Sequence, residues 1–367
     1  MQNPNFFIFE IGYALVPFEK LAEMVLPRDV IGGHGAIEKI YDVLIRVTDG
    51  RKVVVVTGEK TYNLAGKRVA EILNSNGVET KVMIMGEATE ENVEKVKEES
   101  KKMGAKVIIG AGGGSKIDIA KKSAFDLNVY FISVPTSASH DGVASPRASI
   151  KKGEISVSME AAMPVAIVAD TEIMVKSPFR LLASGAADVL SNLTALKDWS
   201  LAHRLKGEKI SSSGYMIAEF AAKEIINNAA QIKPNIEESV WVVMKQIAFS
   251  GIAMSVSGSS RPASGAEHMF AHAVDTLKKG NGLHGELCGI GTIISMYLHG
   301  GDWNLVKDTL QKIGAPTKLD QVGLSEDDAV QALMMAHKVR PERYTILGEN
   351  GLSEIAAKEA LRFTEVL

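Results

Sequence analysis

Three of the chain's eight histidines occur within residues 267–286, "EHMFAHAVDTLKKGNGLHGE". On a helix, at about 100° per residue, His268, His272 and Asp275 fall within about 60° of one another, opposite an apolar side that packs. The two histidines are therefore expected to face a cleft or solvent, and the pattern leaves both alternatives open. Histidine pairs at i and i+4 occur in zinc sites on helices, although HExxH is absent here. His284 follows in the Gly-flanked "GNGLHGE" and could turn toward the same cleft.

A metal ion also needs an anionic ligand, and one aspartate occurs in a helical segment of small residues. Asp188 lies in "ASGAADVLSNL". Ser184, Asn192 and Ala195 share its predicted helix face, which leaves room for an ion. A plain surface aspartate is the simpler alternative. The sequence therefore makes Asp188 a candidate ligand only.

A glycine-rich turn predicts an anion site. The apolar run 106–111 leads into "GGGSKIDIAKKSA" at 112–124, where three glycines allow close backbone approach to a ligand. Ser115 or Asp118 could cap the following helix, whose first N–H groups attract a phosphate. The turn matches neither GxGxxG nor a Walker loop, and tight packing alone is the alternative. A second small-residue loop, "PTSASHDGVASP" at 135–146, follows the next run.

The elements that must position these residues follow two different sequence patterns along the chain. Short apolar runs typical of strands buried on both faces lie at 52–57, 80–85, 106–111, 129–134 and 165–170. Helix-like segments separate them, which predicts a parallel sheet in an α/β nucleotide domain. After about residue 178 only helical patterns follow. We therefore expect an α/β Rossmann-like domain over 1–174 and an all-helical domain over 175–367.

Composition excludes several classes of protein. The chain has 367 residues, 46% hydrophobic and 23% charged, with a formal net charge of −3, so a nucleic acid partner is not expected. The single cysteine, Cys288, rules out an internal disulfide framework and is typical of a reducing cytoplasm. The apolar stretch near the start is broken by Glu10 and lacks a basic lead-in, so we expect no signal peptide and no transmembrane segment.

Taken together, the motifs resemble a known family. The GGGSxxD turn is followed in order by "TSASHDG", "SGAAD", "SGSSRPASGAEHMFAH" and "GLHGE". This series resembles the archaeal-type glycerol-1-phosphate dehydrogenases, in the superfamily of glycerol dehydrogenase, the iron-type alcohol dehydrogenases and 3-dehydroquinate synthase. The resemblance covers about residues 25–365. It implies a Rossmann-like amino-terminal domain, a helical carboxyl-terminal domain and an active site between them.

The resemblance also implies roles for individual residues. One zinc ion per subunit is implied at Asp188, His268 and His284, with zinc favoured over iron through the resemblance alone. His272 then faces the substrate, as does Asp141 near the nicotinamide, and both are implied, with Asp188, to serve catalysis. Residues implied to bind NAD or NADP are Gly114, Ser115, Lys116, Ile117 and Asp118 of the turn, and Thr136, Ser137, Ala138, Ser139 and Ser145 of the second loop.

The implied reaction is the reversible reduction of dihydroxyacetone phosphate to sn-glycerol 1-phosphate, for archaeal-type ether phospholipid synthesis in the cytoplasm. The substrate phosphate needs donors, and Ser259, Ser260 and Arg261 are candidates because they form a Ser-rich turn ahead of a helix. A salt bridge is the alternative for Arg261. We also expect a homo-oligomer of unspecified size.

Three other functions are less consistent with the sequence. A 3-dehydroquinate synthase-like lyase needs a denser set of lysines and arginines than 135–151 or 257–285 offers. A glycerol dehydrogenase-like enzyme for uncharged polyols would not need the "SSRP" turn. A metal and nucleotide binding module is disfavoured because structural zinc sites are normally closed by four protein ligands.

Cofactor choice depends on the residue after the first apolar run. An acidic residue there hydrogen-bonds the adenosine ribose in NAD-only enzymes. Gly58 has no side chain for this, and Glu59 could instead point to solvent. We therefore expect the protein to accept both NADH and NADPH. Residues 1–24 precede the usual start of the family and receive no role.

Overall fold

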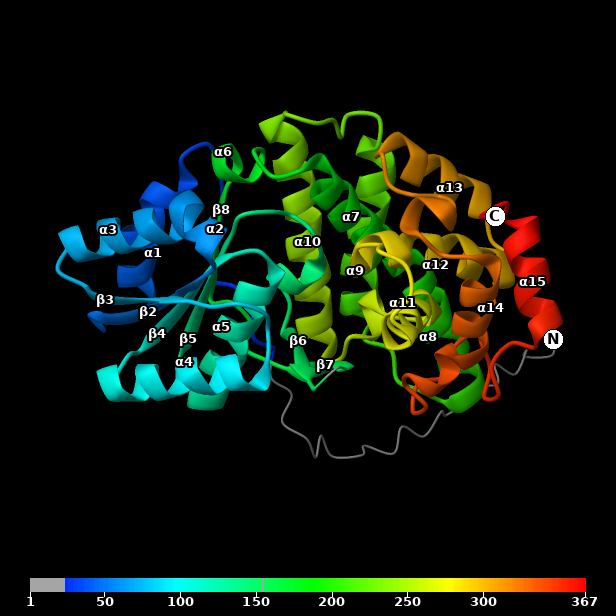
Figure 1. The fold of residues 1–367 in the computed structure, drawn as a ribbon, viewed down its shortest axis with the longest axis horizontal. Coiled ribbons are helices and arrows are strands. Elements are labelled where there is room, and N and C mark those ends of the chain that lie inside the picture. Colours follow the sequence, from blue (N-terminus) through cyan, green and yellow to red (C-terminus); the bar gives the residue numbers. More distant parts are fainter. Residues whose placement is uncertain (1–23, 154) are drawn as a thin grey trace, which may run out of the picture.

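The computed structural model describes residues 24–153 and 155–367, and the expectations for the first 23 residues lie outside this range. A parallel sheet forms one end of the described protein, and a body of helices forms the other (Figure 1). The order of the sheet is β1-β8-β5-β4-β2-β3. Its strands are β1 (Asp29–Gly33), β2 (Lys52–Thr57), β3 (Glu79–Ile84), β4 (Val107–Gly112), β5 (Tyr130–Pro135) and β8 (Ala166–Asp170).

The sheet forms because its central strands can bury both faces. In β2, Val53 and Val55 pack into one hydrophobic cluster, which also holds Leu44 and Leu73. Val54 and Val56 point the other way into a second cluster with Ile117. All four valines are fully buried, and each contributes about 1.5–3 kcal/mol of hydrophobic stabilisation. The absence of polar alternation in this run is thus explained by helices on both faces.

Helices cover both faces of the sheet (Figure 1). Helices α1 (Ile40–Val47) and α3 (Lys67–Ser75) lie on one side with the short α2 (Glu59–Thr61), and α4 (Glu90–Met103) and α5 (Gly114–Leu127) lie on the other. The remaining helices are α6 (Thr171–Met174), α7 (Phe179–Leu190), α8 (Asn192–Lys206), α9 (Ser212–Asn228), α10 (Glu237–Ser257), α11 (Ala266–Leu277), α12 (His284–Leu298), α13 (Trp303–Lys312), α14 (Glu326–Met335) and α15 (Glu354–Phe363).

The predicted fold class is confirmed. All five predicted strands are present, each within one residue of its predicted position. The sequence analysis missed β1 and the antiparallel hairpin of β6 (Arg147–Lys152) and β7 (Ile155–Glu160). The hairpin has polar residues at many positions and forms a separate two-stranded sheet, so it lacks the apolar run that marked the buried strands.

The two parts of the chain share a hydrophobic core. One cluster contains Ile117 of α5 next to the sheet as well as Ala186 of α7 and Ile247 of α10. The division at residues 174 and 175 therefore stays a prediction, although the described chain after β8 contains helices and no further strand.

Helix α10 lies at the side of the helical body that is next to the sheet (Figure 1). Among the described residues it is the one helix long and apolar enough to cross a membrane, with a mean hydropathy of 1.4 over its most apolar window. Of that window, 61% is buried inside the protein, mainly against α9 and α7. Its apolar composition is therefore accounted for by packing within the fold.

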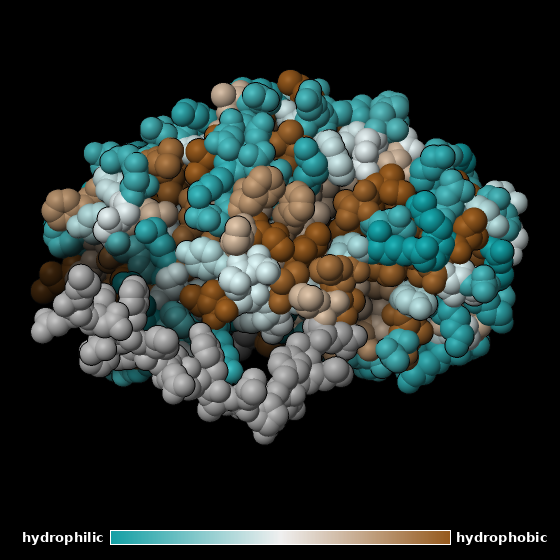
Figure 2. Space-filling view, turned by 180° about the vertical axis from the view of Figure 1, so that it is seen from behind, coloured by the Kyte–Doolittle hydropathy of each residue, from teal (hydrophilic) through white to brown (hydrophobic). Residues whose placement is uncertain are grey.

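The face opposite that of Figure 1 mixes polar and apolar side chains, with apolar ones gathered toward its middle (Figure 2). Exposed apolar residues of the described chain include Met216, Phe220 and Phe249, and the last two rings pack edge to face at 5.6 Å. The expected homo-oligomer and cytoplasmic location stay predictions.

Candidate active site

Three predicted metal ligands meet although they come from three helices. Asp188 lies near the end of α7, His268 in the first turn of α11, and His284 at the first position of α12. Nε2 of His268 is 3.5 Å from Oδ1 of Asp188, and Nε2 of His284 is 3.9 Å from the same oxygen. That oxygen is fully buried and accepts no hydrogen bond. A buried carboxylate oxygen that faces two imidazole nitrogens suits a divalent cation.

The surroundings keep the Asp188 carboxylate charged. Burial by itself raises its pKa, but His268, His284 and the backbone N–H of Asp141 outweigh burial and hold the pKa of Asp188 below its usual value. The N–H of Asp141 donates to Oδ2 of Asp188 at 2.8 Å. Asp188 therefore presents a negative oxygen to the two histidines.

Glu267 fixes the orientation of the His268 ring. Oε1 of Glu267 is 3.0 Å from Nδ1 of His268, so the opposite nitrogen is directed at Asp188. Glu267 is itself fully buried and accepts hydrogen bonds from Thr194 Oγ1 at 2.9 Å and from the N–H of Gly265 at 2.5 Å. A carboxylate behind a ligating histidine is a common feature of metal sites.

Cys288, which the sequence analysis did not consider as a ligand, belongs to the same cluster. Its sulfur lies with one ligand atom from each of His268, His284 and Asp188, and these four atoms are all within 4.8 Å of one another. Sγ is 3.6 Å from Nε2 of His284, because the two residues are one turn apart on α12. This i, i+4 spacing was the sequence signal that could have identified it.

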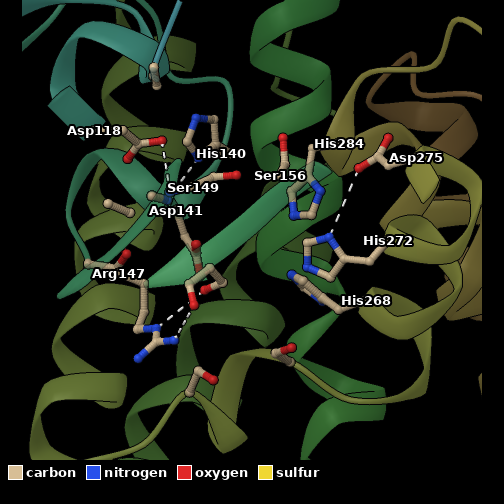
Figure 3. Close-up of a pocket in the computed structure, with 18 of the residues that line it drawn as sticks. Asp118, His140, Asp141, Arg147, Ser149, Ser156, His268, His272, Asp275 and His284 are labelled. Carbon is tan, nitrogen blue, oxygen red and sulfur yellow. Dashed lines mark hydrogen bonds and ion pairs between the residues drawn. The ribbon is translucent and has the colours of Figure 1, made fainter. Parts of the chain in front are cut away.

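His272 lies beside the cluster and points into the cavity (Figure 3). Its ring centroid is 5.4 Å from that of His284 and 6.4 Å from that of His268. Burial, with His284 and His268 nearby, lowers the pKa of His272 well below its usual value. His272, Asp275 and His284 form a second group that could hold a cation, so geometry alone does not separate the roles of the three histidines.

Asp141 joins the loop after β5 to the helices. Besides its N–H bond to Asp188, its Oδ2 accepts a hydrogen bond from Ser250 of α10 at 2.9 Å. Burial and the charge of Asp188 raise the pKa of Asp141 to about 6. Its carboxyl group can therefore gain or lose a proton near neutral pH.

Two glycines allow this loop to lie directly on the helices. A Cβ at Gly185 would be 2.0 Å from the carbonyl oxygen of Ala138, and one at Gly251 would be 2.1 Å from that of Ala144. Any larger residue would push the loop away from α7 and α10. This close approach is the physical reason for glycine in "SGAAD".

The cluster opens on a cavity of about 300 Å³. Predicted site residues that line it are Gly114, Ser115, Asp118, Asp141, Ser145, His268, His272 and His284. A second cavity, of about 580 Å³, shares Gly114 and Ser115 with the first and extends to Gly58, Glu59 and Lys116 at the carboxyl ends of the strands. The two cavities therefore connect the glycine turn with the histidines.

The other predicted cofactor residues are less accessible. Thr136, Ser137 and Ala138 are buried, and the side chain of Ile117 is in the core, so only backbone atoms of Ile117 could reach a ligand. The backbone carbonyl oxygen of Ser139 accepts a hydrogen bond from Oγ of Ser184 at 3.0 Å.

The predicted cap of the helix after the turn was wrong. Helix α5 begins at Gly114 with Gly113 as its N-cap, and no side chain caps it. Asp118 instead pairs with Lys121 at 3.0 Å and accepts a hydrogen bond from the N–H of Ser149 at 3.2 Å. The first N–H groups of α5 are thus not used by a side-chain cap, which favours anion binding.

Arg261, a candidate for the substrate phosphate, is used elsewhere. It forms an ion pair with Glu208, with Nε 2.7 Å from Oε1, and donates to the carbonyl of Tyr344 at 2.9 Å. It is buried and does not line the cavity, so the salt-bridge alternative holds for this residue. Ser259 is also outside the lining, whereas Ser260 belongs to it.

Sequence reasoning missed two arginines of the cavity, Arg147 and Arg340. Arg147 follows the second loop directly and could have been noticed there, but nothing in the sequence around Arg340 points to the site. A lyase was disfavoured because residues 135–151 and 257–285 hold few cations, and Arg340 lies outside both ranges. The relatives described next favour a dehydrogenase over a lyase.

Residues 31–178 match the family model described as iron-containing alcohol dehydrogenase. Glycerol-1-phosphate dehydrogenase (NAD(P)+) of Thermoplasma volcanium is 49% identical over 95% of this chain and 99% of its own length. The corresponding enzyme of Picrophilus torridus is 50% identical with the same coverage. The crystal structure of a probable glycerol dehydrogenase from Sinorhizobium meliloti 1021 shares the fold, with a TM-score of 0.75 and 20% identity over 94% of this chain and all of that one. With such identity over nearly its whole length, the chain belongs to the NAD(P)-dependent glycerol-1-phosphate dehydrogenase family of oxidoreductases.

Proposed function

We propose that the protein catalyses the reversible, NAD(P)-dependent reduction of dihydroxyacetone phosphate to sn-glycerol 1-phosphate, with one zinc ion per subunit. The observation that carries this proposal is the buried Oδ1 of Asp188. It lacks a hydrogen-bond partner and faces Nε2 of His268 and of His284 beside a cavity that reaches the glycine turn. The names of the relatives reported above, which are glycerol-1-phosphate dehydrogenases, support the choice of substrate.

Asp188, His268 and His284 are the proposed zinc ligands. One carboxylate and two imidazoles are a donor set that zinc accepts, and three protein ligands keep a position open for a substrate. When bound, zinc supplies a Lewis acid for the carbonyl group and the nicotinamide supplies the hydride. Burial of Asp188 and His268 limits the access of bulk water to this centre, whereas the His284 side chain is 33% exposed.

Asp141 and His272 are proposed to handle hydroxyl groups and the proton. The pKa of Asp141, raised to about 6, lets its carboxyl group exchange a proton with a substrate oxygen near neutral pH. His272 is neutral because its pKa is lowered, so its ring can both donate and accept a hydrogen bond. Both side chains line the cavity next to the proposed ligands (Figure 3).

The connected cavities are the proposed site of the dinucleotide. The uncapped start of α5 offers backbone N–H groups to the pyrophosphate. The loop that carries Asp141 contacts both this turn and the histidines: a Cβ at Gly114 would be 2.2 Å from Nε2 of His140, and the His140 and His284 ring centroids are 6.5 Å apart. Its serines and its backbone provide the polar contacts.

Absorbance at the nicotinamide band tests the proposal. Purified protein is given dihydroxyacetone phosphate with NADPH or NADH, and in parallel glycerol with NAD. We expect rapid cofactor oxidation with the phosphorylated ketone, slow reaction with glycerol, and a product of the sn-glycerol 1-phosphate configuration. Faster turnover of glycerol, or the opposite configuration, would overturn the proposal. Elemental analysis of the same preparation determines whether the metal is zinc.

A further inference from the structure

Three arginines near the cavity form no ion pair within 4.0 Å in the described residues. Glu160 lies opposite Arg147 in the hairpin and Glu342 lies near Arg340 and Arg343, but neither carboxylate contacts them directly. Arg147 of β6 donates to Ser158, from Nη2 to the carbonyl at 2.8 Å and from Nε to Oγ at 3.3 Å. Arg340, which follows α14, donates from Nη1 to Ser260 Oγ at 3.2 Å. Arg343 donates to Ser260 Oγ at 3.0 Å and to the carbonyl of Ser264 at 2.7 Å. In the described part of the chain, no carboxylate lies within ion-pair distance of any of the three.

Arg261, unlike these three arginines, has an ion-pair partner. It lies in the same region, and the fold supplies Glu208 as its counter-charge. Burial and the neighbouring Arg147 lower the pKa of Arg340, and burial with Arg340 and Arg261 lowers that of Arg343 to about 9. Partly buried charges without a counter-ion are costly, so a protein retains them where a ligand brings the opposite charge.

We propose that Arg147, Arg340 and Ser260 bind the phosphate dianion of the substrate, with Arg343 as the residue that positions Ser260. This inference rests on the proposed function for the identity of the phosphate carrier. Ser260 Oγ accepts hydrogen bonds from both Arg340 and Arg343, so its own proton is available to a phosphate oxygen. Planar guanidinium groups suit a phosphate because they donate in pairs.

The position of the arginines fits a phosphate attached to a short carbon chain. Arg147, Ser260 and Arg340 line the same cavity as His268 and His284. Figure 3 shows Arg147 on the side of this cavity opposite the three histidines. A small phosphorylated ketone could therefore place its phosphate at the arginines and its carbonyl group at the proposed metal ligands.

The same arginines also line another cavity. This neighbouring cavity, of about 810 Å³, shares Arg147, Arg340 and His272 with the first. Its charged lining, histidine aside, comprises Arg147, Lys151, Lys278, Lys338 and Arg340 against Asp275 and Glu342. Lys151 is paired with Glu87 at 2.9 Å, so the other four cations face two carboxylates and leave this lining positive, although the whole chain carries −3. Such a field attracts a dianionic substrate and raises its association rate.

The test compares two ketones that differ only in the phosphate. We expect Arg340→Gln and Arg147→Gln each to lower kcat/KM for dihydroxyacetone phosphate about 10- to 100-fold, the usual range for a lost charge-assisted hydrogen bond. Activity with dihydroxyacetone, KM for NADPH and metal content should stay within about two-fold of the wild type. Arg340→Lys should fall between, because it keeps the charge and loses the paired donors. Arg68→Gln, which removes an exposed arginine paired with Glu38, is the matched control.

Three results would overturn the inference. An equal loss of kcat/KM with both ketones would mean that the arginines support the fold and do not bind phosphate. A lowered melting temperature of the variants would accompany that outcome. A rise in KM for NADPH with unchanged KM for the ketone phosphate would assign them to the cofactor. Unchanged kcat/KM for dihydroxyacetone phosphate in both Gln variants would mean that Arg147 and Arg340 do not bind the substrate.

Calorimetric titration with inorganic phosphate separates this inference from the proposed function. If the wild type does not reduce dihydroxyacetone phosphate, the proposed function fails. Phosphate binding that is lost in Arg340→Gln would then still support the subsite, and binding that survives in both Gln variants would contradict it.

Discussion

The backbone N–H of Asp141 donates a 2.8 Å hydrogen bond to Oδ2 of Asp188, and the other oxygen of Asp188 is left without a partner. This bond attaches the loop after the sheet to the helix that carries the proposed metal ligand. It therefore couples the position of a proposed proton-handling residue to that of the proposed metal centre.

Loss of either proposed histidine ligand should remove the metal. We expect His268→Ala and His284→Ala to lose bound zinc and to lose turnover to background, because two remaining ligands hold zinc weakly. The fold should survive, since the side chains stand at a cavity wall. Elemental analysis, circular dichroism and the cofactor assay measure the three properties. A variant that keeps full zinc and full turnover would contradict the ligand assignment.

His272 should behave differently from its two neighbours. His272→Ala is expected to keep zinc and to lower kcat about 100- to 10,000-fold, as for the loss of a general acid or base. The comparison is with His268→Ala, assayed for metal under the same conditions. If His272→Ala loses metal as completely, then the alternative group of His272, Asp275 and His284 holds the ion.

Glu267 should tune metal affinity without contacting the ion. Glu267→Gln removes the charge behind Nδ1 of His268 while the side chain keeps its size. Changes of this kind typically weaken metal binding about 10- to 100-fold. Competition with a chelator measures the affinity, with Asp170→Asn as control, because Asp170 is a buried carboxylate that caps α6 and does not line the cavity. An affinity within two-fold of the wild type would mean that Glu267 only supports the packing.

Cys288 is expected not to bind the metal, because a fourth protein ligand would close the position that the substrate needs. Cys288→Ala should therefore keep zinc and most of its turnover. In the cobalt-substituted wild type, the near-ultraviolet band of a thiolate ligand should be absent. Its presence, and its loss in Cys288→Ala, would make Cys288 a fourth ligand, as its 3.6 Å distance from His284 Nε2 would allow.

Cofactor choice should depend on Gly58. A Cβ there would be 2.7 Å from Cε of Lys116, so Asp at this position would place a carboxylate beside that lysine and near a ribose phosphate. Like charges at about 4 Å repel by about 1 to 4 kcal/mol, depending on solvent exposure. We expect the wild type to use NADH and NADPH, and Gly58→Asp to shift the ratio of kcat/KM at least about ten-fold toward NADH. Gly58→Asn controls for size, and an equal shift in that variant would rule out charge as the cause.

The central strands, the glycine turn and the order of the two parts could be predicted from the sequence. Each is a local pattern: β2 is a run of valines because both of its faces are buried, and Gly112 to Gly114 occur where a strand turns into a helix. The family motifs are likewise short segments in a fixed order. Asp188, His268 and His284 could be named in this way before any distance was known.

The phosphate-facing side of the cavity could not be predicted in this way. Arg147 and Arg340 come from segments 193 positions apart in the sequence, and neither segment has a pattern that marks it. Arg261 matched a plausible motif, yet Glu208 neutralises it in the folded chain. Periodicity reveals which side of an element is buried, because that depends on neighbours along the chain. Which charges remain unpaired depends on side chains that packing brings together from distant segments, and only the tertiary structure decides this.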